Sequence, residues 1–380
     1  MILDYETLKL IWWLFVGVLL IGFAVTGGFD LGIGTLLPFV GRNDEERRVV
    51  INSIGPTWDG NQVWFITAGG ALFAAWPLVY AAAFSGFYFA LLLVLLALIL
   101  RPVGFDFRSK LPSERWRRFW DWALFAGGAA PALVFGVAFG NLLQGVPFHY
   151  DASLRPFYTG SFFALLNPYA LLAGLVSLCM LIMHGSLYLQ MRTEGEIYRR
   201  AKRATMIFAT LFMVLFALAG TWLAFGVEGY KIVAMPDPNS AFSPLAKTVA
   251  RAPGAWLSNY GRYPWMLLAP ALGFAGAALA MLAAARNRPG IGFVCSAFAL
   301  AGVILTAGLA MFPFVLPSSA SPNDSLTAWD AVSSRRTLMI MFWAVLIFLP
   351  IVIAYTSWVF SKLRGKITTE QIHKDTHTAY

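Results

Sequence analysis

The chain is dominated by apolar runs that are long enough to cross a lipid bilayer. The hydrocarbon core of a bilayer is about 30 Å thick, which needs about 20 helical residues at about 1.5 Å each. Most of the apolar runs meet or approach that length. We therefore predict helices over residues 10–39, 64–76, 78–100, 119–143, 162–191, 205–225, 265–285, 291–312 and 338–360.

Composition supports a membrane protein. Hydrophobic residues make up 59% of the chain and charged residues only 12%, with a mean hydropathy of +0.68. These values are typical of a polytopic membrane protein. The first apolar run continues for about thirty residues from Leu10, longer than the apolar part of a signal peptide, so we expect this helix to remain. We predict a single polytopic membrane domain over residues 1–380.

The number of helices depends on how residues 63–100 are divided. As one helix these roughly 38 residues would be about 57 Å long, nearly twice the hydrocarbon core. Pro77 follows Trp76 and is the expected break, because proline removes a backbone hydrogen bond. The helix before this break would need residues 58–62 as its first turns. This division gives an all-α fold of about nine transmembrane helices.

Basic residues indicate how the helices are oriented. With nine spans, about 20 of the 28 lysines and arginines lie on one side, which the positive-inside rule makes cytoplasmic. An eight-span arrangement would place about 18 there, so helix length decides between the two. The amino terminus is then periplasmic, residues 226–264 form a periplasmic loop with a short surface helix, and residues 361–380 form a cytoplasmic tail. The net charge of +9 reflects this orientation and not nucleic-acid binding.

Two acidic residues lie where the surrounding sequence is apolar. Asp30 belongs to a glycine-rich segment in which Gly28 and Gly32 share a small-residue face. Either a packing seam with one hydrogen-bonded carboxylate or a proton or ion path fits this segment. Asp59 has the stronger functional signal, because the neighbouring Asn61 adds a hydrogen-bond donor and a carboxylate in the membrane is costly to keep without a function.

Arg101 and Asp106 end the predicted helix 78–100 at the cytoplasmic side. They fit a snorkelling anchor and a helix cap, or a contact with a cofactor or a partner subunit. Both interpretations remain open from the residues alone.

Histidine and cysteine restrict the cofactors that this chain can bind. His184 is the only histidine in a predicted span, whereas haem in a helical bundle usually takes axial ligands from facing helices. We expect His184 to be a hydrogen-bonded helix residue and not an iron ligand. Cys179 and Cys295 lie inside apolar runs and form neither a disulfide framework nor a haem-attachment motif. Any iron is therefore expected in another chain.

Motifs for nucleotide binding, metalloprotease and serine hydrolase chemistry are absent from the sequence. Residue-level reasoning thus leaves two classes of function. One is a subunit of a respiratory complex, and the other is an ion-coupled secondary transporter that uses Asp30 and Asp59.

A set of short motifs narrows this choice. Together they resemble subunit II of the cytochrome bd quinol oxidase, and the resemblance covers nearly the whole chain. The motifs are GRNDEERR (41–48), WDGNQVW (58–64), GGALFAAWP (69–77), AAFSGFY (82–88), RPVGFD (101–106), FGNLLQGVPF (139–148) and FPFVLPSS (312–319).

The resemblance implies a fold and a function. Members of this family fold as two four-helix bundles plus one peripheral helix, in the bacterial inner membrane. Subunit II pairs with subunit I in a heterodimer, and subunit I ligates two haems b and one haem d. The complex oxidises quinol, reduces oxygen to water and generates proton motive force. Some relatives also hold a quinone in subunit II or bind a small accessory subunit, for which the sequence offers no residue set.

The resemblance also implies roles for individual residues. Asp59 and Asp30 match acids on a proposed proton path, Trp64 matches a residue at the mouth of an oxygen tunnel, and Arg101 matches an arginine near the subunit or haem boundary. The sequence departs from the family at two places. Gly27 stands where many members have Asp, and Thr57 stands where some have His, so a path that relies on either titratable group is in doubt here.

Overall fold

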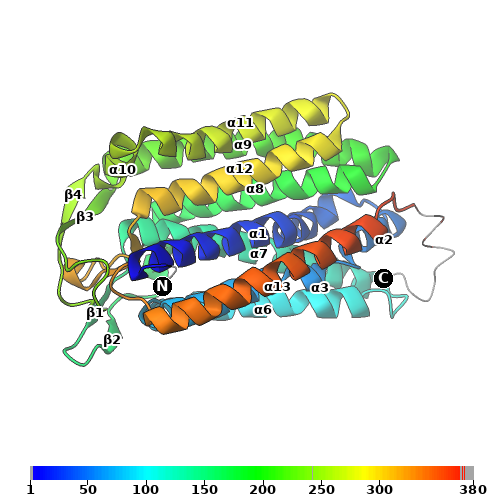
Figure 1. The fold of residues 1–380 in the computed structure, drawn as a ribbon. Helices are drawn as coiled ribbons and strands as arrows, with labels where there is room; N and C mark the ends of the chain where they lie inside the picture. Colours follow the sequence, from blue (N-terminus) through cyan, green and yellow to red (C-terminus); the bar gives the residue numbers. More distant parts are fainter. Residues whose placement is uncertain (1–2, 242, 369, 371, 373–380) are drawn as a thin grey trace.

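Long helices that run nearly parallel or antiparallel form the bulk of the molecule (Figure 1). The computed structural model describes residues 3–241, 243–368, 370 and 372. The long helices are α1 (Tyr5–Val40), α6 (Tyr88–Phe107), α7 (Glu114–Gln144), α8 (Pro168–Arg192), α9 (Gly195–Gly226), α11 (Leu268–Ala285), α12 (Pro289–Met311) and α13 (Arg335–Lys362). Shorter helices are α2 (Asp44–Ile54), α3 (Trp58–Asn61), α4 (Val63–Ala75), α5 (Pro77–Gly86) and α10 (Ser258–Arg262).

The helices pack in two groups. Helices α8, α9, α11 and α12 contact one another in a closed ring of four. Helices α1, α4, α6 and α7 form the other group, in which α1 contacts α4 and α7, and α7 contacts α6. Helix α13 packs on α1 and leaves most of its apolar side chains exposed, including those of Trp343 and Phe348. The prediction of two four-helix bundles and one peripheral helix is confirmed.

In the described part of the chain, eight helices are long and apolar enough to cross a membrane. The ninth predicted span, 64–76, is α4, which α3 precedes by one residue. The predicted break is present, since Trp76 has non-helical backbone angles of φ −130° and ψ 72°. A second break at Phe87 was not predicted. It follows the Ser85–Gly86 pair, and such pairs commonly mark helix kinks.

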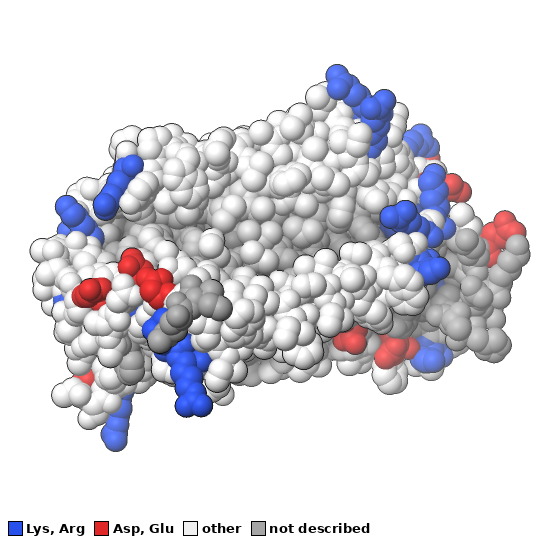
Figure 2. Space-filling model, viewed as in Figure 1, with Lys and Arg blue, Asp and Glu red and all other residues white. Residues whose placement is uncertain are grey.

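Both ends of the bundle carry charge, and the face seen in Figure 2 has an uncharged band between them. The turns after α6, α8 and α11 lie at the same end as the end of α13, whereas α1 begins at the opposite end (Figure 1). In the space-filling view, Lys, Arg, Asp and Glu cluster at the two ends and a broad band without charge separates them (Figure 2). This distribution agrees with the grouping of basic residues in the sequence, although Lys374 lies outside the described residues.

The end opposite the basic turns is covered by hairpins. The 226–264 loop contains β3 (Glu228–Ala234) paired with β4 (Thr248–Pro253), followed by α10. The short helix was predicted and the two-stranded sheet was not, because its alternation is irregular. The other hairpins pair β1 (Phe148–Tyr150) with β2 (Pro156–Tyr158), and β5 (Phe314–Leu316) with β6 (Leu326–Thr327).

Glycines allow α1 to approach α8 closely. A methyl group on Gly32 would collide with the carbonyl oxygen of Leu181, and one on Gly185 would lie 2.8 Å from the carbonyl oxygen of Phe29. Gly28 faces the side chain of Leu181 on the same side of the helix. The predicted small-residue face of α1 is therefore a packing surface against α8.

A network of ion pairs fastens α2 to the ends of α6 and α7. Asp121 accepts a 2.6 Å hydrogen bond from Arg108 Nε and a 2.7 Å bond from Arg47, while Asp44 accepts from Arg108 and Arg117. Arg108 and Asp121 are each 1% exposed. Because buried charges are stable only when they are paired, each member of this pair depends on the other.

A second ion pair joins α2 to α9. Glu46 accepts hydrogen bonds from Arg200 and from the backbone N–H of Arg42. Partial burial acts to raise the pKa of Glu46, yet the hydrogen bonds and the charge of Arg200 outweigh it and hold the pKa below its ordinary value. This contact therefore contributes stability above the ordinary pKa of a glutamate and loses it as the pH falls through the lowered value.

Replacement of Asp121 tests the network. Asp121→Asn leaves the buried Arg108 without its closest anion, and we expect it to destabilise the protein by about 3–5 kcal/mol. The measurement is the midpoint of thermal unfolding of the purified complex in detergent. Glu114→Gln, at an exposed position at the start of α7, is the matched control. Equal midpoints for both variants would show that the network contributes little.

Candidate functional site

Asp30 is a fully buried carboxylate in the first bundle. It lies on α1 with 0% exposure, and its Oδ2 accepts a 2.8 Å hydrogen bond from Asn61 Nδ2 at the end of α3. Its Oδ1 has no hydrogen-bond partner among the described residues. A buried acid with a free oxygen is costly, so it marks a candidate functional position.

Arg101 is the cation that faces Asp30. It is 3% exposed on α6, interacts electrostatically with Asp30 and lies 5.5 Å from the ring centroid of Trp58. Gly127 on α7 leaves room for it, because a methyl group there would lie 2.8 Å from Arg101 Cγ. The side chain is therefore inside this chain, and its Nη2 has no hydrogen-bond partner in the described residues.

Asp59 differs from Asp30 in its surroundings. It lies on α3 two residues before Asn61, but its side chain is exposed in the isolated chain. It continues a stripe of exposed apolar residues on α4 that includes Val63, Ile66 and Phe73. In the isolated chain Asp59 is therefore exposed, whereas Asp30 is buried. Asn61, which we expected to support Asp59, donates to Asp30 instead.

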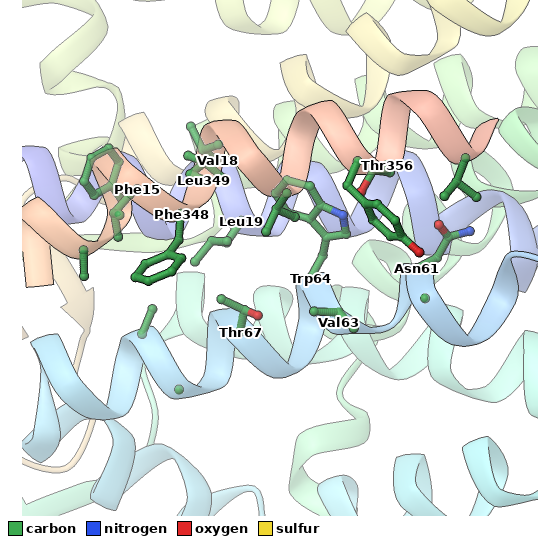
Figure 3. A pocket seen from close by; sticks show the side chains of 18 of the residues that line it. Phe15, Val18, Leu19, Asn61, Val63, Trp64, Thr67, Phe348, Leu349 and Thr356 are labelled. Atoms are coloured by element: carbon green, nitrogen blue, oxygen red, sulfur yellow. The ribbon is translucent and has the colours of Figure 1, made fainter. Parts of the chain in front are cut away.

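A cavity of about 790 Å³ lies between α1, α4 and α13. Figure 3 shows Trp64 pointing into it between these helices, with Phe15, Val18 and Phe348 toward one end and Asn61 and Thr356 toward the other. The cavity is apolar over most of its length. Asn61, which donates a hydrogen bond to Asp30, is one of its lining residues, so the cavity reaches the residue that holds the buried acid.

Helix α4 packs against α1 and leaves the cavity between itself and α13. Gly22 on α1 accommodates the ring of Trp64, since a methyl group there would lie 2.5 Å from Trp64 Cε3. The ring therefore packs against α1 while the rest of α4 stands away from α13. A second apolar cavity of about 940 Å³ flanks the other side of α4, against α6, α7 and α12.

The two departures from the family pattern both lie beside this site. Thr57 is buried and lines the cavity next to Asn61. A methyl group on Gly27 would point at the Phe23 ring, with the carbonyl oxygen of Asn61 3.6 Å away. The missing titratable groups would therefore lie beside the Asp30–Asn61 pair.

His184 is buried in α8 with both ring nitrogens engaged. Its Nδ1 lies 2.7 Å from Ser296 Oγ on α12, and its Nε2 lies 2.9 Å from the carbonyl oxygen of Val25 on α1. Neither nitrogen is free to ligate iron. In the described part of the chain, no three His, Cys, Asp or Glu side chains gather as a metal site. His373 and His377 lie outside the described residues.

Sequence reasoning missed two features of the site. It did not pair Asn61 with Asp30, which come from segments 31 residues apart. It also passed over Asp121, although a carboxylate between Trp120 and Trp122 at the start of an apolar run was a visible signal. Charged residues in apolar runs indicate where helices from distant parts of the chain meet.

The fold and the site define an integral membrane protein of two helix bundles with a buried acid, an arginine that faces it and an apolar cavity beside them. Comparison with known families is more specific. Residues 8–363 match the family model described as cytochrome bd terminal oxidase subunit II. The chain belongs to this family.

Individual relatives agree with the family match. The chain is 56% identical to the cytochrome bd-I ubiquinol oxidase subunit 2 of Escherichia coli strain K12, over 100% of both chains. It is 32% identical to the cytochrome bd ubiquinol oxidase subunit 2 of Bacillus subtilis, over 95% of this chain and 97% of that protein. A chain from the structure of bd oxidase from Geobacillus thermodenitrificans shares the fold, with a TM-score of 0.69 at 15% identity over 93% and 98% of the two chains.

Proposed function

We propose that this chain is the haem-free subunit of a cytochrome bd ubiquinol oxidase that provides protons and oxygen to haems held by subunit I. The observation that carries the proposal is the buried Asp30, hydrogen-bonded to Asn61 and facing Arg101, in a member of the subunit II family. Family membership favours this function over the ion-coupled transporter. The ubiquinol specificity rests on the names of the relatives.

The cofactors belong to the complex and not to this chain. Two haems b and one haem d, ligated by subunit I, would carry electrons from quinol to oxygen. In support, His184 has both nitrogens bonded within the chain. The complex lies in the bacterial inner membrane, with the amino terminus of this chain periplasmic and the end of α13 cytoplasmic, as the basic turns indicate.

Reduction of oxygen to water consumes protons that must cross an apolar bundle. In the described residues Asp30 Oδ1 and Arg101 Nη2 have no hydrogen-bond partner. Each can therefore bond a water molecule that carries a proton along the path. The carboxylate is then the acceptor that receives a proton, and Arg101 stabilises its charged form. Asn61 holds the carboxylate in place from the other side.

Asp59 and the exposed stripe on α4 form a surface on which subunit I would dock. Asp59, Val63, Ile66 and Phe73 are spaced to lie along one side of α3 and α4, and each is exposed. Lipid would cover the three apolar residues well but would leave the carboxylate without a polar partner. Subunit I on this face would cover the stripe and place Asp59 at the entry of the proton path.

Oxygen needs an apolar route, in contrast to the polar path that protons need. It is apolar and partitions into lipid, so the cavity between α4 and α13 is a suitable route from the bilayer. Trp64 lines this cavity and its ring packs against Gly22 of α1. Protons and oxygen would thus reach the same region by a polar and an apolar route.

Asp30→Asn tests the proton path directly. Asparagine keeps the size and the contact with Asn61 but cannot carry a proton. We expect quinol-driven oxygen uptake by the purified complex to fall about a hundredfold, with the haem spectrum unchanged. Asp106→Asn, at an exposed position on α6, is the control and should retain the wild-type rate. A wild-type rate in Asp30→Asn would remove the residue from the path.

Asp59→Asn tests the entry of that path. We expect slower oxygen reduction without loss of haem or of subunit I, because the substitution removes a titratable group and keeps the shape of the stripe. Oxygen uptake and co-purification of subunit I are the two measurements. Turnover at the wild-type rate would show that protons enter elsewhere.

Trp64→Leu tests the oxygen route. The smaller side chain changes the shape of the cavity between α4 and α13, so we expect the KM for oxygen to change more than the KM for quinol. Steady-state kinetics of the complex provide both values. Trp343→Leu is the control, because Trp343 is exposed on α13 and does not line the cavity. A larger change in the KM for quinol would contradict the role of Trp64.

A further inference from the structure

The segment of α1 that ends at Asp30 is held by α8 through two contacts one helical turn apart. His184 bonds the carbonyl oxygen of Val25, and the ring of Tyr188 stacks on Phe29 with 4.0 Å between centroids and 10° between planes. Asp30 follows Phe29 directly. Both contacts lie on the face where glycines bring α1 and α8 together.

Hydrogen bonding and burial together define the tautomer of His184. The carbonyl oxygen of Val25 can only accept, so Nε2 carries a hydrogen. Ser296 Oγ, on a residue that is 0% exposed, lies 2.7 Å from Nδ1 and 2.8 Å from the carbonyl oxygen of Phe293, and its single hydrogen can go to only one of them. If it went to Phe293, Nδ1 would also have to carry a hydrogen to bond Ser296. A doubly protonated ring here would be a fully buried cation, which is unfavourable in apolar surroundings. His184 is therefore a neutral bridge from α12 to α1.

The ring is also fixed in orientation. It stacks on Phe293 of α12 with 4.3 Å between centroids and 18° between planes. Two hydrogen bonds and one stacked face leave the imidazole little freedom to rotate. In an apolar bundle such bonds between helices set the position of one helix along another.

We propose that His184 is a positioning residue for the proton path, and that it holds the Val25–Asp30 segment of α1 so that the Asp30 carboxylate meets Asn61 and Arg101. The inference rests on the proposed role of Asp30. His184 and Ser296 belong to α8 and α12, so under this inference the second bundle positions the acid of the first.

The test compares two substitutions at His184 in the purified oxidase. His184→Leu fills the space but removes both bonds, and we expect kcat for oxygen uptake to fall about tenfold because a carboxylate displaced by a fraction of an ångström transfers protons poorly. The KM values for quinol and oxygen should stay unchanged. His184→Gln should restore most of the rate, since its amide N–H can donate to Val25 and its carbonyl can accept from Ser296.

The same substitutions in an Asp30→Asn background decide whether His184 acts through Asp30. We expect His184→Leu to have no further effect on kcat there. An equal fall in both backgrounds, or failure of His184→Gln to restore the rate, would overturn the inference. If His184→Leu does not assemble, as judged by loss of the haem spectrum, Ser296→Ala replaces it, with an expected fall of about twofold that also disappears in the Asp30→Asn background.

These outcomes separate the inference from the function on which it rests. A wild-type rate in Asp30→Asn overturns the proposed proton path and the inference together. A slow Asp30→Asn with a wild-type rate in His184→Leu overturns only the positioning role.

Discussion

The hydrogen bond from Asn61 to Asp30 is the contact on which the organisation of the first bundle depends. A carboxylate in an apolar bundle needs polar partners, and the chain provides them from two other segments, α3 and α6. Asn61 reaches α1 from the end of the short α3, and the break at Trp76 ends the following helix, α4, after 13 residues. The cavities on both sides of α4 follow from this arrangement, because a short helix packed on α1 does not fill the space up to α13 or α7.

The two faces of α1 make different contacts: one packs closely against α8, and the other makes polar contacts with α3 and α6. Toward α8, the glycines at positions 28, 32 and 185 remove side chains so that backbones touch. Toward α3 and α6, the same helix presents Asp30 to Asn61 and Arg101. Helix α1 thus has a close-packed face toward the second bundle and a polar contact within the first, so the packing against α8 and the contacts of Asp30 involve the same segment of the helix.

The sequence predicted the long helices, the break at Pro77 and the grouping of basic residues because these depend on local composition. It did not predict which acid is buried. Asp59 and Asp30 both stand beside apolar residues, and only the path of the chain between them places Asn61 against Asp30. The pairing of Arg108 with Asp121 was missed for the same reason: arginines counted only as indicators of orientation also carry the ion network that holds α2.

The ion network and the buried acid are connected through α6 and α7. Arg101 and Arg108 lie two turns apart on the end of α6, so the pair of Arg108 with Asp121 fixes the position of the helix that carries Arg101. Gly127, on the helix that carries Asp121, makes room for the stem of Arg101. The basic residues at this end of the bundle therefore do more than orient the chain in the membrane. They hold together α6 and α7, the two helices that position the Arg101 guanidinium facing Asp30.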